Sequence, residues 1–201
     1  MKTRYLVNVV LAATLVTLAT SALAEDKKPA AAPSEEEMMK KWEAAATPGA
    51  AHKALDALAG EWEVASKMWM APDAPPLETK GKNTTRWILG GRFLQDDFDG
   101  EFQGKPMKGL GLTGYDNLKK KYNGLWMDTG GTGMFTSEGT ASADGKSFTF
   151  TGKMDDPMTG EKDKPLKYTI QIVSHDKHIF EMFDLSNGKS TKMIEMVYTR
   201  K

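Results

Sequence analysis

The chain has 201 residues, which suits one globular domain with an appendage. Its 27 basic and 27 acidic side chains balance, which argues against a nucleic-acid binder, because such a protein needs a basic face to neutralise phosphates. The sequence has no cysteine, which excludes thiol nucleophiles, disulfides, thiolate zinc sites and thioether-linked haem.

The first 24 residues have the pattern of a secretory signal peptide. Lys2 and Arg4 precede an apolar run that extends to about Ala19, and Ala22-Leu23-Ala24 forms an Ala-x-Ala cleavage site. A membrane anchor is the alternative, but threonines dilute the run, and a span needs about 20 apolar residues. We expect a Sec-type signal peptide over residues 1–24. The mature protein should be periplasmic or secreted, should not be a lipoprotein, and should have no membrane span.

Residues 25–49 are expected to form a flexible linker followed by a short helix. The stretch 25–33 is rich in charge, proline and alanine, which is typical of a spacer. Ser34 is a favourable N-cap, and Glu37 completes a capping-box pattern. The helix should run to about Ala46, because a Thr-Pro-Gly sequence follows and stops it.

This first helix carries one apolar stripe, made of Met38, Met39 and Trp42. We expect the stripe to pack on the helix's own domain, and binding to a partner is the alternative. A second short helix is predicted over residues 50–59, where Leu55 and Leu58 are its apolar positions before Gly60.

After Gly60 the apolar period changes from about 3.6 to 2 and stays there, which predicts an all-β body. The alternation in the first strand places Trp62, Val64, Ser66, Met68 and Met70 on one buried face. The predicted strands cover residues 61–70, 79–89, 92–102, 107–115, 121–128, 134–141, 147–153, 166–174, 178–184 and 190–200.

Short turns join these strands. Gly90-Gly91 supply the positive φ of a tight hairpin, which places Trp87 opposite Leu94 and Ile88 opposite Phe93. About ten sequential antiparallel strands fit a sandwich or a barrel. Closure into one barrel is favoured, because a meander with glycine-rich bends removes its own edges. The preceding helix should then cap one end.

Gly60-Glu61-Trp62 opens the first strand, and Arg200 lies near the end of the last. This combination resembles the signature of the calycins, the superfamily of lipocalins and fatty-acid-binding proteins. In that superfamily the tryptophan closes the base of the barrel and a late arginine packs over it.

Further motifs agree in order and spacing with the bacterial family DUF1579, a domain of unknown function, over about residues 50–201. They are 86–94 (RWILGGRFL), 109–117 (GLGLTGYDN), Trp126 with Asp128, 155–160 (DDPMTG), Glu181-Met182 and 195–200 (EMVYTR). The resemblance implies a lipocalin-like β-barrel domain over residues 50–201, preceded by one or two short helices. It implies no activity and no cofactor.

Methionines are the first candidates for a ligand surface. Met68 and Met70 share the predicted inward face, and the last hairpin should place Met182 opposite Met193. A methionine-lined cavity suits an irregular apolar ligand, while methionine as core filler is the structural alternative. Met68-x-Met70 also raises the question of a Cu(I) site, because thioethers are soft ligands.

Two glutamates lie in apolar strands. The predicted register makes Phe180 and Glu195 opposite neighbours, so Glu181 and Glu195 should lie on opposite faces, with at most one of them in the lumen. An acid/base dyad from this pair is therefore not expected. An inward glutamate would need a partner such as Arg86, Arg92 or Tyr115.

The three histidines lack metal-ligand spacing, so we expect no zinc site. His175 and His178 flank a predicted hairpin tip and should be solvated. The sequence Asp155-Asp156-Pro157-Met158-Thr159-Gly160 lacks the ligand alternation of an EF-hand and predicts a turn at a barrel mouth.

Three functional hypotheses remain open. The first is a non-enzymatic binder of a small apolar or amphipathic molecule in the barrel lumen. Its contact residues would be Met68, Met70, Trp87, Trp126, Met182 and Met193, and its polar contacts would come from Arg86, Tyr115, Asp128 or Glu181. The second is an enzyme that uses a lumen carboxylate with a strongly raised pKa. The third is an envelope interaction protein with a filled barrel and an exposed apolar patch over residues 34–46.

Overall fold

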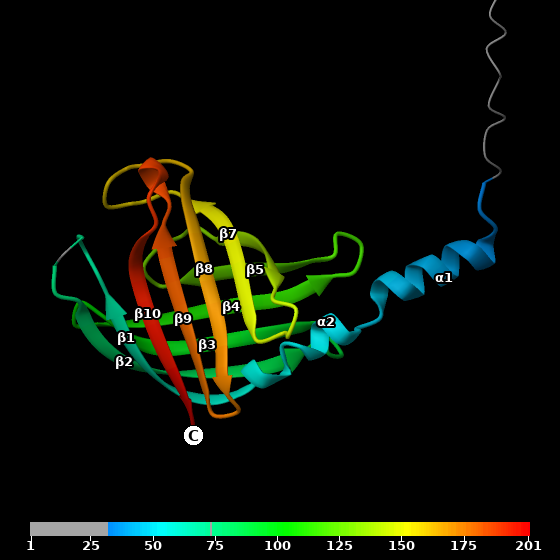
Figure 1. The fold of residues 1–201 in the computed structure, drawn as a ribbon, viewed down its shortest axis with the longest axis horizontal. Coiled ribbons are helices and arrows are strands. Elements are labelled where there is room, and N and C mark those ends of the chain that lie inside the picture. The colour runs from blue at the N-terminus through cyan, green and yellow to red at the C-terminus, as the bar shows by residue number, and fades with distance from the viewer. Residues whose placement is uncertain (1–31, 73) are drawn as a thin grey trace, which may run out of the picture. The chain divides into compact units, whose positions relative to one another are not determined.

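The computed structural model describes residues 32–72 and 74–201. The predicted signal peptide at 1–24 and most of the predicted spacer at 25–33 lie outside the described residues. The part described contains a closed antiparallel barrel of ten strands, each hydrogen-bonded to its neighbours in sequence, with β1 pairing with β10 to complete the ring. The predicted closed barrel is confirmed (Figure 1).

All ten predicted strands are present, with ends within two residues of those expected. They are β1 (Gly60–Met68), β2 (Leu77–Ile88), β3 (Phe93–Phe102), β4 (Lys105–Asp116), β5 (Lys121–Asp128), β6 (Phe135–Ala141), β7 (Ser147–Met154), β8 (Lys164–Ser174), β9 (Lys177–Asp184) and β10 (Thr191–Arg200). The predicted pairing of Trp87 with Leu94 and of Ile88 with Phe93 is observed.

The helical segments are α1 (Glu35–Ala46), α2 (Ala50–Lys53), η1 (Asp56–Leu58) and η2 (Ser186–Gly188). Leu55 and Leu58 are buried against barrel residues that include Phe148 and Phe150. α2 and η1 therefore cap one end of the barrel, as expected. We call this end, where β1 begins and β10 ends, the base (Figure 1). The opposite end, where β1 finishes at Met68 and β8 begins at Lys164, is the mouth.

The calycin-like signature forms at the base. The Trp62 indole Nε1 donates to the Leu58 carbonyl at 3.0 Å, and the Arg200 guanidinium lies 4.2 Å from the centroid of the Trp62 ring. Arg200 also donates to the carbonyls of Ala57 and Ala59. Gly60 has φ +145°, and a β-carbon there would overlap with the Arg200 side chain. The glycine, the tryptophan and the arginine thus lock the chain entering the barrel to its last strand.

The prediction that α1 packs on its own domain is wrong. None of its residues is buried, and Met38, Met39 and Trp42 are 51%, 53% and 69% exposed. The helix is held at its C-terminal end, where the Asn117 amide donates to the carbonyls of Ala44, Ala45 and Thr47. Three apolar side chains on a helix do not show from sequence whether the domain has a surface on which they can pack.

Candidate functional site

The β9–β10 hairpin differs from the predicted register, because β10 has a bulge between Lys192 and Ile194. Met182 therefore pairs with Ile194, so the expected pairing of Met182 with Met193 is wrong. A bulge adds one residue to a strand and shifts every later pair. Met193 lies at the bulge itself.

The same shift corrects the two glutamates. Glu181 and Glu195 are direct partners on one face, whereas opposite faces were expected. Both alternate with inward residues, so both lie on the outside of the barrel, where they bind Lys192 at 2.5 and 2.8 Å. Glu181 is therefore not a lumen carboxylate.

Two other candidates also lie outside the lumen. Arg86 is on the outer face of β2 and forms an ion pair with Asp97. Met70 is 45% exposed and follows the end of β1, which removes the expected Met68-x-Met70 pair from the inward face. The strand ends before Met70 because the chain turns toward the proline-rich loop that precedes β2.

Trp87 and Tyr115 point inward but belong to the closed base. The Trp87 indole donates to the Asp56 carboxylate at 2.9 Å, which attaches η1 to β2. Tyr115 packs edge-on against His52 and Tyr122, with ring centroids 5.8 and 4.9 Å apart. These contacts are those of a packed core rather than of an open surface.

Met68, Trp126, Asp128 and Met182 face the lumen nearer the mouth. The Trp126 indole donates to Asp128 Oδ2 at 2.7 Å, and its ring packs edge-on against Phe98. These four side chains are only half-buried, in contrast to the fully buried Phe148 and Phe150 near the base. The inward surface is therefore accessible on the mouth side and sealed on the base side.

The most unusual group inside the barrel is Asp96, which our sequence analysis did not single out. Its Oδ1 accepts hydrogen bonds from Thr85 Oγ1 at 2.6 Å and Asn83 Nδ2 at 3.0 Å. Burial raises the pKa of the Asp96 carboxyl, the two hydrogen bonds oppose the rise, and the charge of Asp97 adds to it. The alternation Leu94-x-Asp96-x-Phe98 would have predicted an inward Asp96, because period 2 places all three on one face.

The other carboxyl oxygen of Asp96 lies over Gly111. A β-carbon built at Gly111 would be 3.2 Å from Asp96 Oδ2 and 3.3 Å from the Trp126 ring, so the missing side chain makes room for both groups. Within the part of the chain that the structure describes, Oδ2 forms no hydrogen bond, and Asp96 keeps an intermediate accessible surface. The Asp96 carboxyl is removed from bulk solvent but keeps accessible surface. We infer that this surface faces the interior of the barrel.

Two tyrosines share the interior with Asp96. The Tyr168 hydroxyl and Ser137 Oγ are 2.9 Å apart, and the Tyr198 hydroxyl contacts the Met196 sulfur at 3.7 Å. Burial raises the pKa of Tyr168 and of Tyr198, and the Asp96 carboxylate contributes to both shifts. Both phenols therefore stay protonated at neutral pH.

His178 is buried, so the expectation of a solvated histidine is wrong for this residue, while His175 is exposed. The His178 ring stacks on Tyr198 with centroids 4.2 Å apart and meets Trp62 edge-on at 4.4 Å. Burial lowers its pKa to about 3. Its Nδ1 and Ser66 Oγ are buried polar atoms with no hydrogen-bond partner among the described residues.

An ion cluster closes part of the mouth. Lys164 is only 8% exposed and its Nζ lies 3.0 Å from Asp156 and 3.1 Å from Asp184. Hydrogen bonds from Lys164 and from the Met158 amide lower the pKa of Asp156 to about 2. The predicted turn at 155–160 thus lies at the mouth, where Asp156 neutralises the buried Lys164.

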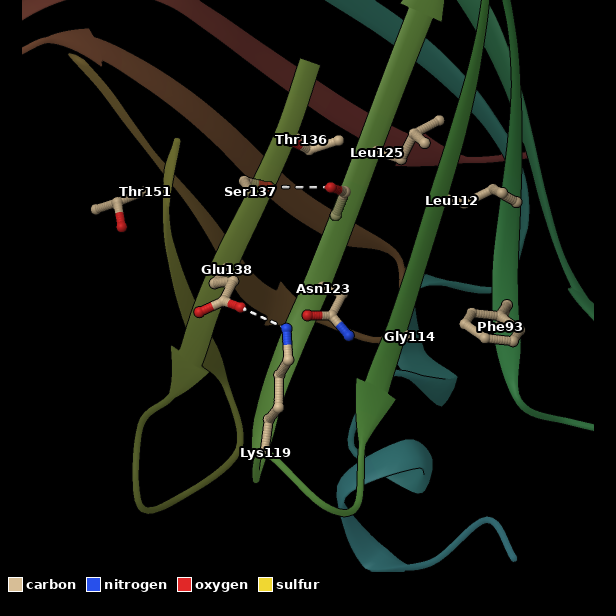
Figure 2. Close-up of a pocket in the computed structure, with 11 residues that line it drawn as sticks. Phe93, Leu112, Gly114, Lys119, Asn123, Leu125, Thr136, Ser137, Glu138 and Thr151 are labelled. Carbon is tan, nitrogen blue, oxygen red and sulfur yellow. Dashed lines mark hydrogen bonds and ion pairs between the residues drawn. The ribbon is translucent and has the colours of Figure 1, made fainter. Parts of the chain in front are cut away.

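A concave surface lies on the outside of the barrel, over β3 to β7 (Figure 2). This outer groove has a volume of about 490 Å³, and its walls include Phe93, Leu112, Leu125, Thr136 and Thr151. Its charged groups are already paired, because Lys119 contacts Glu138 at 3.0 Å. The groove has an apolar floor, and the Asn123 amide also lines it.

In the described ranges 32–72 and 74–201, no three His, Asp or Glu side chains are grouped in a way that could hold a metal ion. Over the same ranges, no helix is both long and apolar enough to cross a bilayer.

Comparisons with known proteins agree with the barrel architecture. A family model described as "Protein of unknown function (DUF1579)" matches residues 47–200. No curated protein matches the sequence. Among solved structures, the barrel resembles Rv2717c from M. tuberculosis, with 17% identity and a TM-score of 0.57 over 77% of this chain and 99% of that one. It also resembles the S-type phycobiliprotein lyase CPES from Guillardia theta, with 12% identity and a TM-score of 0.54 over 84% and 98% of the two chains. At these identities the likeness concerns the fold alone.

Proposed function

The chain belongs to the DUF1579 family of proteins of unknown function, and we propose that it is an exported protein whose barrel binds a small apolar or amphipathic molecule in its lumen. Export rests on the signal-peptide pattern of residues 1–24. Lumen binding rests on the inward-facing side chains of the mouth half.

One observation supports lumen binding above the others. Ser66 Oγ and His178 Nδ1 are buried inside an aromatic barrel without a hydrogen-bond partner among the described residues, and Asp96 Oδ2, which also has none, belongs to a side chain that keeps accessible surface. Buried polar atoms are nearly always bonded, and each exception calls for a water, an ion or a ligand to complete it. Apolar walls with a few convergent polar groups are also what small-molecule sites are made of.

The walls suit an apolar body. Trp126, Phe180, Met182, Met196 and Tyr198 all face inward and retain an intermediate accessible surface. Methionine side chains adapt to irregular shapes, and aromatic faces supply large contact areas. A ligand in contact with these groups would cover surface that the barrel leaves uncovered.

Native mass spectrometry of the protein purified from the cells that produce it tests the proposal. We expect a stoichiometric small molecule, released on denaturation, on the wild-type protein. The variant Gly111→Leu should lose it, because even a β-carbon at Gly111 lies 3.2 Å from Asp96 Oδ2 and 3.3 Å from Trp126, so the larger side chain must displace both groups.

The matched control is Leu125→Ser, which changes the outer groove instead. Circular dichroism of both variants is the check that each one folds. A wild-type protein that stays bare after incubation with a small-molecule extract of the same cells contradicts lumen binding. An adduct lost on Leu125→Ser but kept by Gly111→Leu contradicts it as well, because the molecule would then bind outside.

An enzyme is the second candidate, and the raised pKa of Asp96 is the observation that favours it, since an acid or base catalyst needs such a shift. The same experiment separates the two. A binder predicts that wild type and Asp96→Asn carry the same molecule, whereas an enzyme predicts that the variant retains an unconverted precursor with a different mass or retention time.

A further inference from the structure

We propose that Asp96 acts as a neutral hydrogen-bond donor in the lumen, and that the ligand is an uncharged, largely apolar molecule with a carbonyl-type acceptor bound to Asp96 Oδ2. This inference rests on the proposed lumen binding and names the chemical class of the ligand.

The hydrogen-bond directions determine where the proton lies. Asn83 Nδ2 donates to Thr85 Oγ1 at 2.8 Å, so the Thr85 hydroxyl is free to donate its proton to Asp96 Oδ1. Asn83 Nδ2 donates to the same oxygen. Because Oδ1 already accepts two hydrogen bonds, the proton of a neutral Asp96 lies on Oδ2, the oxygen above Gly111.

The surroundings favour the neutral acid. In the described part of the chain, no lysine or arginine forms an ion pair with Asp96. The inward cations are engaged elsewhere, with Lys164 bound to Asp156 and Asp184 at the mouth and Arg200 stacked on Trp62 at the base. A buried carboxylate without a counter-charge is costly, and protonation removes the cost.

The titratable groups that face Asp96 do not supply a charge to balance it. Tyr168 on β8 and Tyr198 on β10 remain neutral phenols, and Asp97, which lies on the outer face of the same strand, raises the Asp96 pKa further. His178 on β9 stays uncharged above about pH 3. The O–H donor of a neutral Asp96 is surrounded by aromatic rings and methionine side chains. An apolar ligand that carries a carbonyl group would fit these surroundings and accept the hydrogen bond, whereas leaving the buried donor unpaired costs free energy.

Asparagine at position 96 is a sharp test of this geometry. Its carbonyl oxygen can take the place of Oδ1 and keep the bonds from Thr85 and Asn83, which turns its NH₂ group toward the lumen. Asp96→Asn should then reproduce the neutral acid and be insensitive to pH. Asp96→Leu has no donor, and Asp99→Asn, which changes the outer face of the same strand at the ion pair with Lys108, is the matched control.

The experiment titrates the full chain with 6-propionyl-2-(dimethylamino)naphthalene, a fluorescent ketone, and with its 6-propyl analogue, which lacks the carbonyl. At a pH below the Asp96 pKa we expect wild type and Asp99→Asn to bind the ketone about 10-fold more tightly than the analogue. The preference should fall as pH rises through the Asp96 pKa, remain at all pH values in Asp96→Asn, and be absent from Asp96→Leu.

Three results would overturn the inference or its premise. Equal binding of both probes by wild type and Asp96→Leu, with both probes lost in Gly111→Leu, shows that lumen binding stands and that Asp96 is not the anchor. Tighter binding of a 6-propyl-2-(trimethylammonio) analogue, lost in Asp96→Asn, shows that the site holds a cation instead. Failure of all three probes to bind wild type contradicts lumen binding itself.

Discussion

His178 lies between the rings of Trp62 and Tyr198, and burial holds its pKa at about 3, well below the ordinary value of 6.5. As pH falls from 6.5 to about 3, the unfolded chain takes up a proton at this residue and the folded chain does not. The folded state therefore loses stability over that window, by as much as about 1.4 kcal/mol per pH unit.

Replacing the histidine should remove this acid sensitivity. Between pH 6 and pH 4, we expect the free energy of unfolding to fall by about 2 kcal/mol more in wild type than in His178→Phe, as measured by urea denaturation. His175→Phe, whose ring is exposed in the neighbouring turn, should keep the wild-type acid dependence. Parallel curves for wild type and His178→Phe would show that His178 titrates normally.

Individual side chains were the hardest features to predict from sequence. An inward Asp96 follows from the alternation of β3, because Leu94 and Phe98 flank it on the same face. His178 does not follow in the same way, since it is the second residue of β9 and directly follows a polar turn. Its burial depends on Tyr198 of the following strand and on Trp62, which comes from a strand distant in sequence.

Gly60 controls how the chain enters the barrel. Its φ of +145° is unfavourable for any residue with a β-carbon, and such a carbon would overlap with Arg200. We expect Gly60→Ala to lower the free energy of unfolding by at least about 1–3 kcal/mol, because backbone strain and the clash act together.

Chemical denaturation of that variant provides the measurement. Gly133→Ala is the control, because a β-carbon there would meet no atom within 4 Å and its φ is not positive. Its free energy of unfolding should stay within about 0.5 kcal/mol of wild type. A Gly60→Ala variant as stable as Gly133→Ala would show that the glycine, tryptophan and arginine do not lock the base.

Strands were predictable and their irregularities were not. Period-2 alternation located all ten strands, and Gly90-Gly91 gave the right β2–β3 register. The β10 bulge carries no comparable signal in the residues 190–196, and it places on one face the two glutamates that were expected on opposite faces. α1 was predictable as a helix from its N-cap and from the Thr-Pro-Gly sequence that ends it. The exposure of its apolar side chains was not predictable, because their burial depends on a surface elsewhere in the fold.

Closure of the barrel was predictable because ten strands joined in sequence leave two edges, and pairing of β1 with β10 removes both. The site was less predictable, because it is assembled from inward side chains of strands that are distant in sequence. Trp126, Met68 and Met182 were chosen correctly as inward residues, whereas Arg86 and Glu181 lie outside. The resulting molecule has a packed base, inward side chains near the mouth that are only half-buried, and interior polar atoms without a hydrogen-bond partner among the described residues.

Methyl NMR of the protein with ¹³C-labelled methionines tests most directly whether a small molecule enters the lumen. On addition of 6-propionyl-2-(dimethylamino)naphthalene, we expect the methyl resonances of Met182 and Met196 to shift, because both side chains face inward. Met134 and Met158, which are 66% and 71% exposed, should keep their positions and serve as internal references. Shifts confined to Met134 and to Met127, which lie beside each other on the outer surface, would contradict lumen binding.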